Sequence, residues 1–295
     1  MEGEESLEYT YNSSKKCYTV SGIGNFTGSV LTIPAGYNFL PITGIDENAF
    51  SGCTQLTEFI SSRNLHIGKG AFSDCCNLAN VEINSAISIG LGAFENCDSL
   101  VSITIPFVGE AMTTVGCTHF GYIFGANSSA NNKAFVPKSL KSVVINTDYA
   151  ITYRAFEGCN GLESISFTNI QDISIGNHAF TGCTSLTRIS ILGGSLSIGE
   201  QAFEGCNNLS EICVKDVYTW CSIDGLKNIM CFGADNKAFY LDNLPVTEIT
   251  IPDAVRDIPD YAFYKFSNIT DVLMPYTVYS IGAFAKNKKK DIMIW

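Results

Sequence analysis

Basic residues, histidine and tryptophan are scarce in this sequence. Lys and Arg number 18 against 29 Asp and Glu, which gives a net charge of −11, and there are only three His and two Trp. Because phosphate binding requires clustered Lys and Arg, this balance argues against a nucleic-acid partner. The one basic run, Lys286 with Lys288, Lys289 and Lys290, is expected to be a solubilising cap.

Long hydrophobic runs are also absent. No apolar stretch approaches the roughly 18 residues that a membrane-spanning helix needs. The start, MEGEESLEYT, has neither a basic nor an apolar segment, so the sequence predicts no signal peptide. We expect either a cytosolic protein or a domain whose targeting segments are missing. Hydrophobic residues make up 46% and charged residues 16%, which indicates an ordered, packed protein and excludes a disordered one.

Residues suited to catalysis or metal binding are few and dispersed. The histidines are His66, His119 and His178, and a Cys117–His119 pair lacks a third group to orient it. The cysteine spacings fit no zinc motif, and the glycine-rich stretches lack the context of a phosphate-binding loop. Carboxylates are scattered, which gives no support to a glycosidase. We therefore expect a non-enzyme with no cofactor and no metal.

What the sequence does contain is a repeat. Residues 173–191 read ISIGNHAFTGCTSLTRISI, and with Phe180 as position 0 they place Ile at −5, Ala at −1, Cys at +3, Leu at +6 and Ile at +9 and +11. This spacing recurs along nearly the whole chain, ending with Met293 at +9 and Trp295 at +11. The Ala-Phe pairs at −1 and 0 are Ala49-Phe50, Ala71-Phe72, Ala93-Phe94, Ala155-Phe156, Ala179-Phe180, Ala202-Phe203, Ala262-Phe263 and Ala283-Phe284.

Each unit of about 22 residues combines two periodicities. The alternating apolar residues at +9 and +11 are rich in Ile and Val, which predicts a short strand with one buried side. The Ala-Phe-x-x-Cys segment steps by three, as in a 3₁₀ turn, and the Ile-Gly pair before it marks a second short strand. The predicted fold is a leucine-rich-repeat-like solenoid: a curved right-handed coil with a parallel β-sheet on one face and short strands and turns on the other.

Half of the twelve cysteines follow the same register. A small apolar thiol at one turn position of successive coils packs well as a buried ladder, so we favour a reduced core over disulfides. Phe266 takes the same +3 position after Phe263, a replacement that a core position tolerates and a disulfide does not. The +3 cysteines are Cys53, Cys75, Cys97, Cys159, Cys183 and Cys206.

The chain is expected to form two parts. Residues 1–41 lack the repeat, and their glycine-bounded alternation predicts a β-hairpin that caps the first coil. Residues 42–295 form the predicted solenoid. The +9 series jumps from Ile103 to Val143 and from Ile212 to Ile249, which indicates two single coils with inserts at about residues 107–139 and 215–245.

The two inserts resemble each other, because both contain Phe-Gly-Ala followed by Asn-Lys-Ala-Phe. Long insertions in solenoid proteins often form binding sites. The alternative, which we favour, is a packed aromatic flap. The aromatic residues that suggest core packing are Phe120, Tyr122, Phe124, Trp220 and Phe232.

The repeat residues resemble the BspA-like leucine-rich-repeat proteins, whose units run roughly I-x-x-I-G-x-x-A-F-x-x-C-x-x-L-x-x-I-x-I-P. The resemblance covers about residues 7–295, including the N-terminal hairpin. It implies a modular surface protein of a bacterium or protozoan, linked to adhesion to host proteins and other cells. It also implies a cell-surface or extracellular location, with the cytoplasm as the alternative.

The strand positions that point away from the core, +8 and +10, are the candidate binding surface. They are rich in Ser and Thr with a few carboxylates and offer no aromatic ring for stacking on a glycan, so a protein partner suits them better. We expect a monomer that binds a protein through this face; the alternative is a structural spacer with no ligand of its own. The candidate binding residues are Glu58, Asn80, Glu82, Ser102, Thr104, Arg188, Glu211, Glu248 and Asp271.

Overall fold

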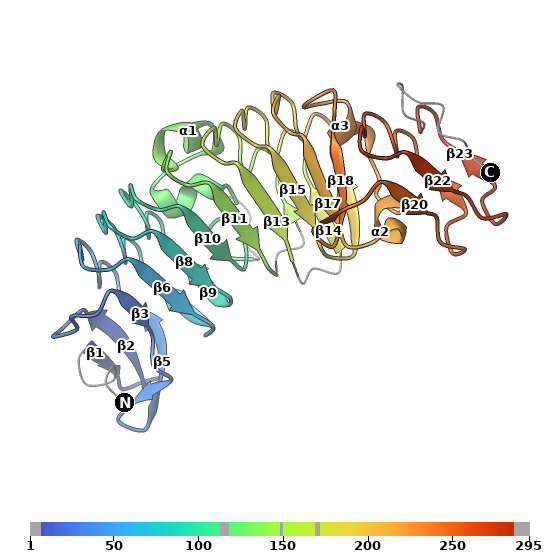
Figure 1. Ribbon diagram of the computed structural model, residues 1–295. Coiled ribbons are helices and arrows are strands. Elements are labelled where there is room, and N and C mark those ends of the chain that lie inside the picture. Colours follow the sequence, from blue (N-terminus) through green and yellow to red (C-terminus); the bar gives the residue numbers. More distant parts are fainter. Residues whose placement is uncertain (1–6, 113–117, 148–149, 169–171, 286–295) are drawn as a thin grey trace. The chain divides into compact units, whose positions relative to one another are not determined.

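The computed structural model describes residues 7–112, 118–147, 150–168 and 172–285. The basic run at 286–290 and the expected repeat positions Met293 and Trp295 lie outside these residues. The chain separates into two compact units, Met1–Asp148 (unit 1) and Tyr149–Trp295 (unit 2). Each unit is a solenoid of coils with parallel strands, which confirms the fold predicted from the repeat (Figure 1).

Unit 1 begins with an antiparallel hairpin, β1–β2, as the alternation in this region suggests. Strand β2 pairs in parallel with β5, and later coils add β7 and β9 to the same sheet. Strand β4 folds back on β5 through a two-residue turn. The strands are β1 (Glu8–Asn12), β2 (Cys17–Gly22), β4 (Gly36–Tyr37), β5 (Leu40–Ile45), β7 (Leu65–Ile67) and β9 (Ala86–Ile89).

The second sheet of unit 1 carries the repeat strands, all parallel and in register. It begins at Val30, inside the range assigned to the cap, because Leu31 is a buried residue aligned with Phe59 of the next coil. Its strands are β3 (Val30–Thr32), β6 (Glu58–Ser61), β8 (Asn80–Ile83), β10 (Ser102–Ile105) and β11 (Ser142–Ile145). The first insert contributes η1 (Phe120–Phe124), η2 (Ser129–Asn131) and α1 (Asn132–Phe135).

Unit 2 repeats this arrangement. One parallel sheet is formed by β13 (Ser164–Phe167), β15 (Arg188–Ile191), β17 (Glu211–Val214) and β18 (Ala238–Leu241), with β19 (Leu244–Pro245) turned back on β18. The others are β12 (Ala150–Ile151) with β14 (Asp172–Ile175) and β16 (Ser195–Ile198), β20 (Glu248–Thr250) with β22 (Asp271–Leu273), and β21 (Asp257–Ile258) with β23 (Ser280–Ile281). The second insert forms α2 (Val217–Cys221) and α3 (Lys227–Met230).

The repeat phenylalanines form the centre of each core. In unit 1 the rings of Phe50 and Phe72 stack at 5.1 Å between centroids, and those of Phe72 and Phe94 at 5.4 Å. In unit 2, Phe180 stacks on Phe203 at 5.1 Å. Such pairs contribute about 0.5–1.5 kcal/mol each beyond the area they bury. The repeat spacing therefore translates into one continuous aromatic stack within each group of regular coils.

The predicted cysteine positions are buried. Cys75 and Cys183 are fully buried, and each thiol donates a hydrogen bond to the carbonyl oxygen of the phenylalanine one coil earlier, Phe50 at 3.1 Å and Phe156 at 3.2 Å. The eleven cysteines that the structure describes are free thiols. Phe266 is also fully buried at its +3 position. The ladder is thus a reduced part of the core.

The register assigned to Ala283-Phe284 is wrong. Ile281 pairs with Ile258, which places Phe284 level with Tyr261 at position −2, and the two rings stack at 5.1 Å. Phe284 is 58% exposed, while Ala285 is 3% exposed and takes the alanine position. The turn needs a left-handed residue at −2, and Phe284 has that conformation with φ 53°. The Ala-Phe pair matched the motif by identity, but the distance from the preceding Ile fixes the register.

The first insert supplies its own substitute for the repeat pair. The N–H of Phe94 donates to the carbonyl oxygen of Ile123 at 2.8 Å, where other coils present the repeat alanine. Phe124 then lies in the core, 1% exposed. Of the proposed flap residues, Phe120, Phe124 and Trp220 are buried, whereas Tyr122 and Phe232 are only half-buried.

The second insert is not a single lengthened coil, as the jump from Ile212 to Ile249 suggested. Phe239 is fully buried and pairs with Ile212, so β18 is the next strand of the sheet. Ile249 lies in the separate β20–β22 pair. The sequence did not reveal this strand because the residues before Phe239 depart from the repeat motif, with Met230 at position 0 and Gly233 at +3. The first copy of Asn-Lys-Ala-Phe forms helix α1 instead. The conformation of the tetrapeptide therefore depends on the segments that pack against it, and these cannot be inferred from the repeat spacing.

Candidate functional site

The outer face of unit 1 is the surface formed by the outward side chains of β3, β6, β8, β10 and β11. Along each strand the residues at +9 and +11 are buried and those at +8 and +10 point outward. The parallel register aligns equivalent positions of neighbouring coils into two rows across the sheet. The predicted alternation therefore becomes a regular, solvent-facing surface.

The structure brings five of the predicted binding residues together on this face. Glu58, Asn80 and Ser102 are neighbours in one row, and Glu82 and Thr104 are neighbours in the other. Ser102 donates a hydrogen bond to Asn80 Oδ1 at 2.8 Å. Asn80 and Glu82 are exposed, and the other three are half-buried. The hydrogen bond orients Ser102 and Asn80 relative to each other, and the strand register sets the spacing of the five residues.

The charge of this face is negative. The strands β3, β6, β8, β10 and β11 contain Glu58 and Glu82 but no Lys or Arg. Glu82 accepts a hydrogen bond from the side chain of Asn84 at 2.6 Å, which orients the carboxylate without neutralising it. The face is thus suited to a partner that brings cationic and hydrogen-bonding groups.

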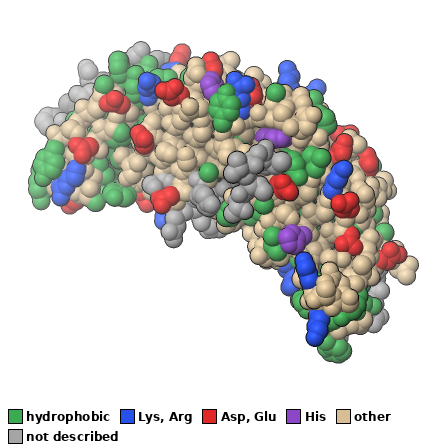
Figure 2. Space-filling view, turned by 180° about the vertical axis from the view of Figure 1, so that it is seen from behind, with side chains coloured by type: hydrophobic (Ala, Val, Ile, Leu, Met, Phe, Trp, Pro, Cys, Tyr) green, Lys and Arg blue, Asp and Glu red, His purple; other side chains and the backbone are tan. Residues whose placement is uncertain are grey.

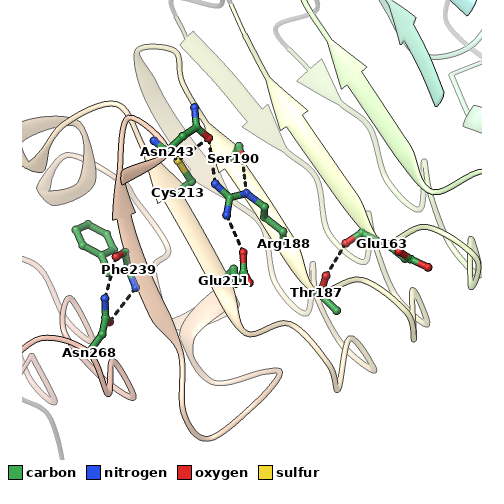
Figure 3. A network of polar contacts seen from close by, with 9 residues as sticks. All are labelled: Glu163, Thr187, Arg188, Ser190, Glu211, Cys213, Phe239, Asn243 and Asn268. Atoms are coloured by element: carbon green, nitrogen blue, oxygen red, sulfur yellow. Dashed lines mark hydrogen bonds and ion pairs between the residues drawn. The ribbon is translucent and has the colours of Figure 1, made fainter. Parts of the chain in front are cut away.

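In unit 2 the corresponding surface is partly occupied by the chain itself. Arg188 forms an ion pair with Glu211 at 2.6 Å and donates a hydrogen bond to Asn243 Oδ1 at 3.0 Å (Figure 3). Its guanidinium also stacks on Tyr240 at 4.7 Å from the ring centre. Asn243 lies in the turn between β18 and β19, so Arg188 ties that turn to the sheet. Two of the predicted binding residues therefore serve an internal contact.

The same contact buries two positions expected to face solvent. Ser190 is 2% exposed and Cys213 is fully buried, because Arg188 and Asn243 lie against them. Sequence reasoning also missed Tyr240, an aromatic residue on this face. Tyr240 directly follows the buried Phe239, so alternation along a strand would have placed it on the outer face. It was missed because the sequence did not predict β18 as a repeat strand.

The last two predicted residues lie on a separate strand pair. Glu248 of β20 and Asp271 of β22 are register neighbours and both are exposed. Each is the only charged residue of its strand, and both are acidic. They share a sign with Glu58 and Glu82, but they belong to unit 2 and form their own small acidic patch.

The histidines and cysteines do not assemble into a reactive centre among the described residues. His66 is exposed and contacts Ser88 at 2.9 Å, and His178 contacts Glu204 at 3.6 Å. Burial lowers the pKa of His119, which is buried and contacts the amide oxygen of Asn132. Cys117 lies outside the described residues. No metal-binding group of three or more His, Cys, Asp or Glu occurs in the part of the chain that the structure describes.

Two further observations concern the distribution of charge on the surface and the length of the helices. On the face that Figure 2 shows, acidic and basic side chains are interspersed among polar and apolar ones. Within the described ranges, the helices are all too short or too polar to traverse a bilayer.

The family comparison agrees with the repeat. The family model described as BspA type Leucine rich repeat region matches residues 31–123, 128–224 and 233–294, in six copies. Together these ranges cover most of the chain. No protein with a curated description matches.

Several solved structures are similar to the chain. A leucine rich cell surface protein from Faecalibacterium prausnitzii is 22% identical, with a TM-score of 0.38 over 95% of this chain and 72% of its own. A leucine-rich repeat protein from Bacteroides ovatus is 19% identical, with a TM-score of 0.34 over 98% and 93%. A leucine-rich repeat protein from T. pallidum is 17% identical, with a TM-score of 0.25 over 94% and 83%. Because these TM-scores are below 0.5, the solved structures support no conclusion beyond the match to the family model.

Proposed function

Because the chain belongs to the BspA-type leucine-rich repeat family, we propose that it is a non-enzymatic, protein-binding scaffold that acts in adhesion at a cell surface. The family resemblance supports a surface role, and the repeat fold supports a scaffold. Solenoids present extended surfaces built from equivalent positions of successive coils, which is the usual basis of their binding.

The observation that carries the proposal is the outer face of unit 1. Its two rows of polar side chains are aligned by the parallel register and carry Glu58 and Glu82 without a cation on the same strands. A protein partner with Lys or Arg side chains complements this charge. In unit 2 the β18–β19 turn engages the equivalent face of β15 and β17 through Arg188, whereas Glu82 on the outer face of unit 1 is exposed.

Beads coated with the full-length protein test this proposal, with adherence to cultured epithelial cells and to purified extracellular-matrix proteins as the measurement. We expect Glu82→Lys and Glu58→Lys to reduce adherence about tenfold, because each introduces a like charge opposite the partner's cations. Glu47→Lys is the matched control, since Glu47 is an exposed carboxylate of unit 1 outside these strands.

The two hypotheses give different results. A structural spacer shows no adherence in any version of the protein. Adherence that is unchanged in all three variants would mean that the partner binds elsewhere on the chain and would contradict the assignment of the outer face. Adherence lost only in Glu58→Lys and Glu82→Lys identifies the outer face as the binding surface.

A further inference from the structure

The first insert forms a cleft in unit 1, which we call the α1 cleft. It has a volume of about 500 Å³, within the range of ordinary ligand sites. One wall is the turn that follows Phe94, and the other is helix α1 with the segment after it. The residues that line it are Glu95, Asn96, Asp98, Phe124 and residues 133–139.

The two walls carry opposite charges. Glu95 and Asp98 contribute carboxylates from the turn, and Lys133 and Lys138 contribute ammonium groups from the insert. Among the residues that the structure describes, no ion pair involves either of these lysines. Both lysines and Asp98 are exposed, so their charges are available to a ligand.

The cleft also offers apolar and hydrogen-bonding groups. Phe124 is buried at its base, and Phe135 is 40% exposed on its wall. The hydroxyl oxygen of Ser139 is buried and has no hydrogen-bond partner among the described residues. A buried hydroxyl without a partner costs free energy, which makes it a candidate for satisfaction by a ligand.

The second copy of the tetrapeptide shows that the same lysine and phenylalanine can be buried in this protein. In Asn-Lys-Ala-Phe at residues 236–239, Lys237 and Phe239 are both fully buried. In the copy at 132–135, Lys133 is instead exposed and Phe135 is 40% exposed, both at the cleft. The fold of the first insert therefore leaves the ammonium group of Lys133 and part of the Phe135 ring accessible to a ligand.

We propose that the α1 cleft binds a short peptide segment in which an apolar residue lies between an acidic and a basic one. The acidic side chain pairs with Lys133 and Lys138, the basic one pairs with Glu95 and Asp98, and the apolar one packs against Phe135. This is a second recognition site, separate from the outer face of the sheet, and it does not depend on adhesion through that face.

The test uses the full-length protein and four fluorescent peptides with capped ends and Gly-Ser flanks. Their cores are Glu-Phe-Lys, Gln-Phe-Gln, Glu-Phe-Glu and Lys-Phe-Lys, and binding is measured by fluorescence anisotropy at low and high salt. We expect Glu-Phe-Lys to bind about tenfold more tightly than the other three, and salt to weaken its binding. Equal binding of all four peptides, or no binding of Glu-Phe-Lys, overturns the proposal.

Charge reversal gives a sharper second result. Lys133→Glu combined with Lys138→Glu makes the cleft wholly acidic, so the preference should change from Glu-Phe-Lys to Lys-Phe-Lys. Phe135→Ser should weaken every peptide, and circular dichroism verifies that each variant is folded. The matched control is Lys15→Glu with Lys69→Glu, two exposed lysines of unit 1 outside the cleft.

The outer-face variant Glu82→Lys separates the two proposals, because it should leave peptide binding unchanged. If Glu82→Lys abolishes peptide binding and the charge-reversed cleft does not, the peptide binds the sheet and the cleft assignment is wrong.

Discussion

Lys133 and Lys237 occupy the same place in two copies of Asn-Lys-Ala-Phe, yet Lys133 is exposed and Lys237 is fully buried. The ammonium of Lys237 donates hydrogen bonds to the carbonyl oxygens of Phe232 at 2.7 Å, Leu209 at 2.9 Å and Ala234 at 3.1 Å. It thus joins the second insert to the preceding coil. The pair offers a matched comparison between a structural lysine and a surface one.

Lys237→Met should destabilise the protein by about 3 kcal/mol, because it leaves the carbonyl oxygens of Phe232 and Ala234 without this donor. The carbonyl oxygen of Leu209 keeps the N–H of Ala234 as a donor. Lys133→Met, in the same tetrapeptide, should change the free energy of unfolding by less than about 0.5 kcal/mol. Urea denaturation of both variants measures the difference. If both substitutions changed the free energy of unfolding equally, water would have to donate hydrogen bonds to these carbonyl oxygens once the ammonium is removed.

The cysteine ladder predicts a second contrast. Cys183→Ala removes a buried sulfur and its hydrogen bond to Phe156, and should cost about 1–2 kcal/mol of stability. Cys76→Ala, at an exposed thiol, should cost almost nothing. Thermal unfolding under reducing conditions compares them. A neutral Cys183→Ala would mean that the neighbouring coils close over the lost volume.

Stability should fall as the pH rises above about 9. Burial raises the pKa of the Cys75 and Cys221 thiols to about 12, from an ordinary value of 9.0. Above pH 9 the unfolded chain loses these protons while the folded protein keeps them, so each thiol lowers stability by about 1.4 kcal/mol per pH unit between the two values. Burial also raises the pKa of four further thiols, Cys53, Cys97, Cys159 and Cys183.

One group acts in the opposite direction. Burial lowers the pKa of Lys237 to about 8 from 10.5, so between these values the unfolded chain holds the extra proton and stability rises with pH. The thiols outnumber this lysine, so the net effect above pH 9 is a loss. Denaturant midpoints from pH 7 to pH 11 measure it. A midpoint that stays constant over this range would contradict the buried, protonated ladder.

Phe39 predicts a stabilising substitution. It lies in the two-residue turn between β4 and β5, is fully exposed, and has the left-handed φ of 62°. A bulky residue in this conformation costs about 1 kcal/mol, and glycine relieves that cost. Phe39→Gly should therefore raise stability by up to about 1 kcal/mol, whereas Phe39→Ala keeps the strain and should change little. Thermal unfolding that ranks Phe39→Ala above Phe39→Gly would show that the backbone is not strained.

Much of the fold follows directly from the periodicity of the sequence. Phe72, Cys75 and Val81 are buried where the repeat predicts, because one spacing sets both the turn and the strand of each coil. The outward positions of unit 1 are equally regular, since alternation along a strand decides which side chains face solvent. Glu58 and Asn80 could therefore be placed as neighbours without a structure.

The sequence predicted less where the repeat is interrupted. Arg188 and Glu211 fit the outward pattern, but a turn distant in sequence brings Asn243 onto them. Phe284 matched a motif by identity and is displaced from it by the length of its turn. The contact of Arg188 with Asn243 and the displaced register of Phe284 both depend on contacts or distances that residue types alone do not encode.

The sequence by itself determined the solenoid, its buried thiols and the polar rows of its strands, because each is a local consequence of periodic spacing. Only the tertiary structure decided which copy of Asn-Lys-Ala-Phe is a helix and which enters the sheet. It alone also decided where the chain covers its own surface and that the first insert leaves a cleft. Each of these depends on how distant segments share space, and one short sequence is compatible with either environment.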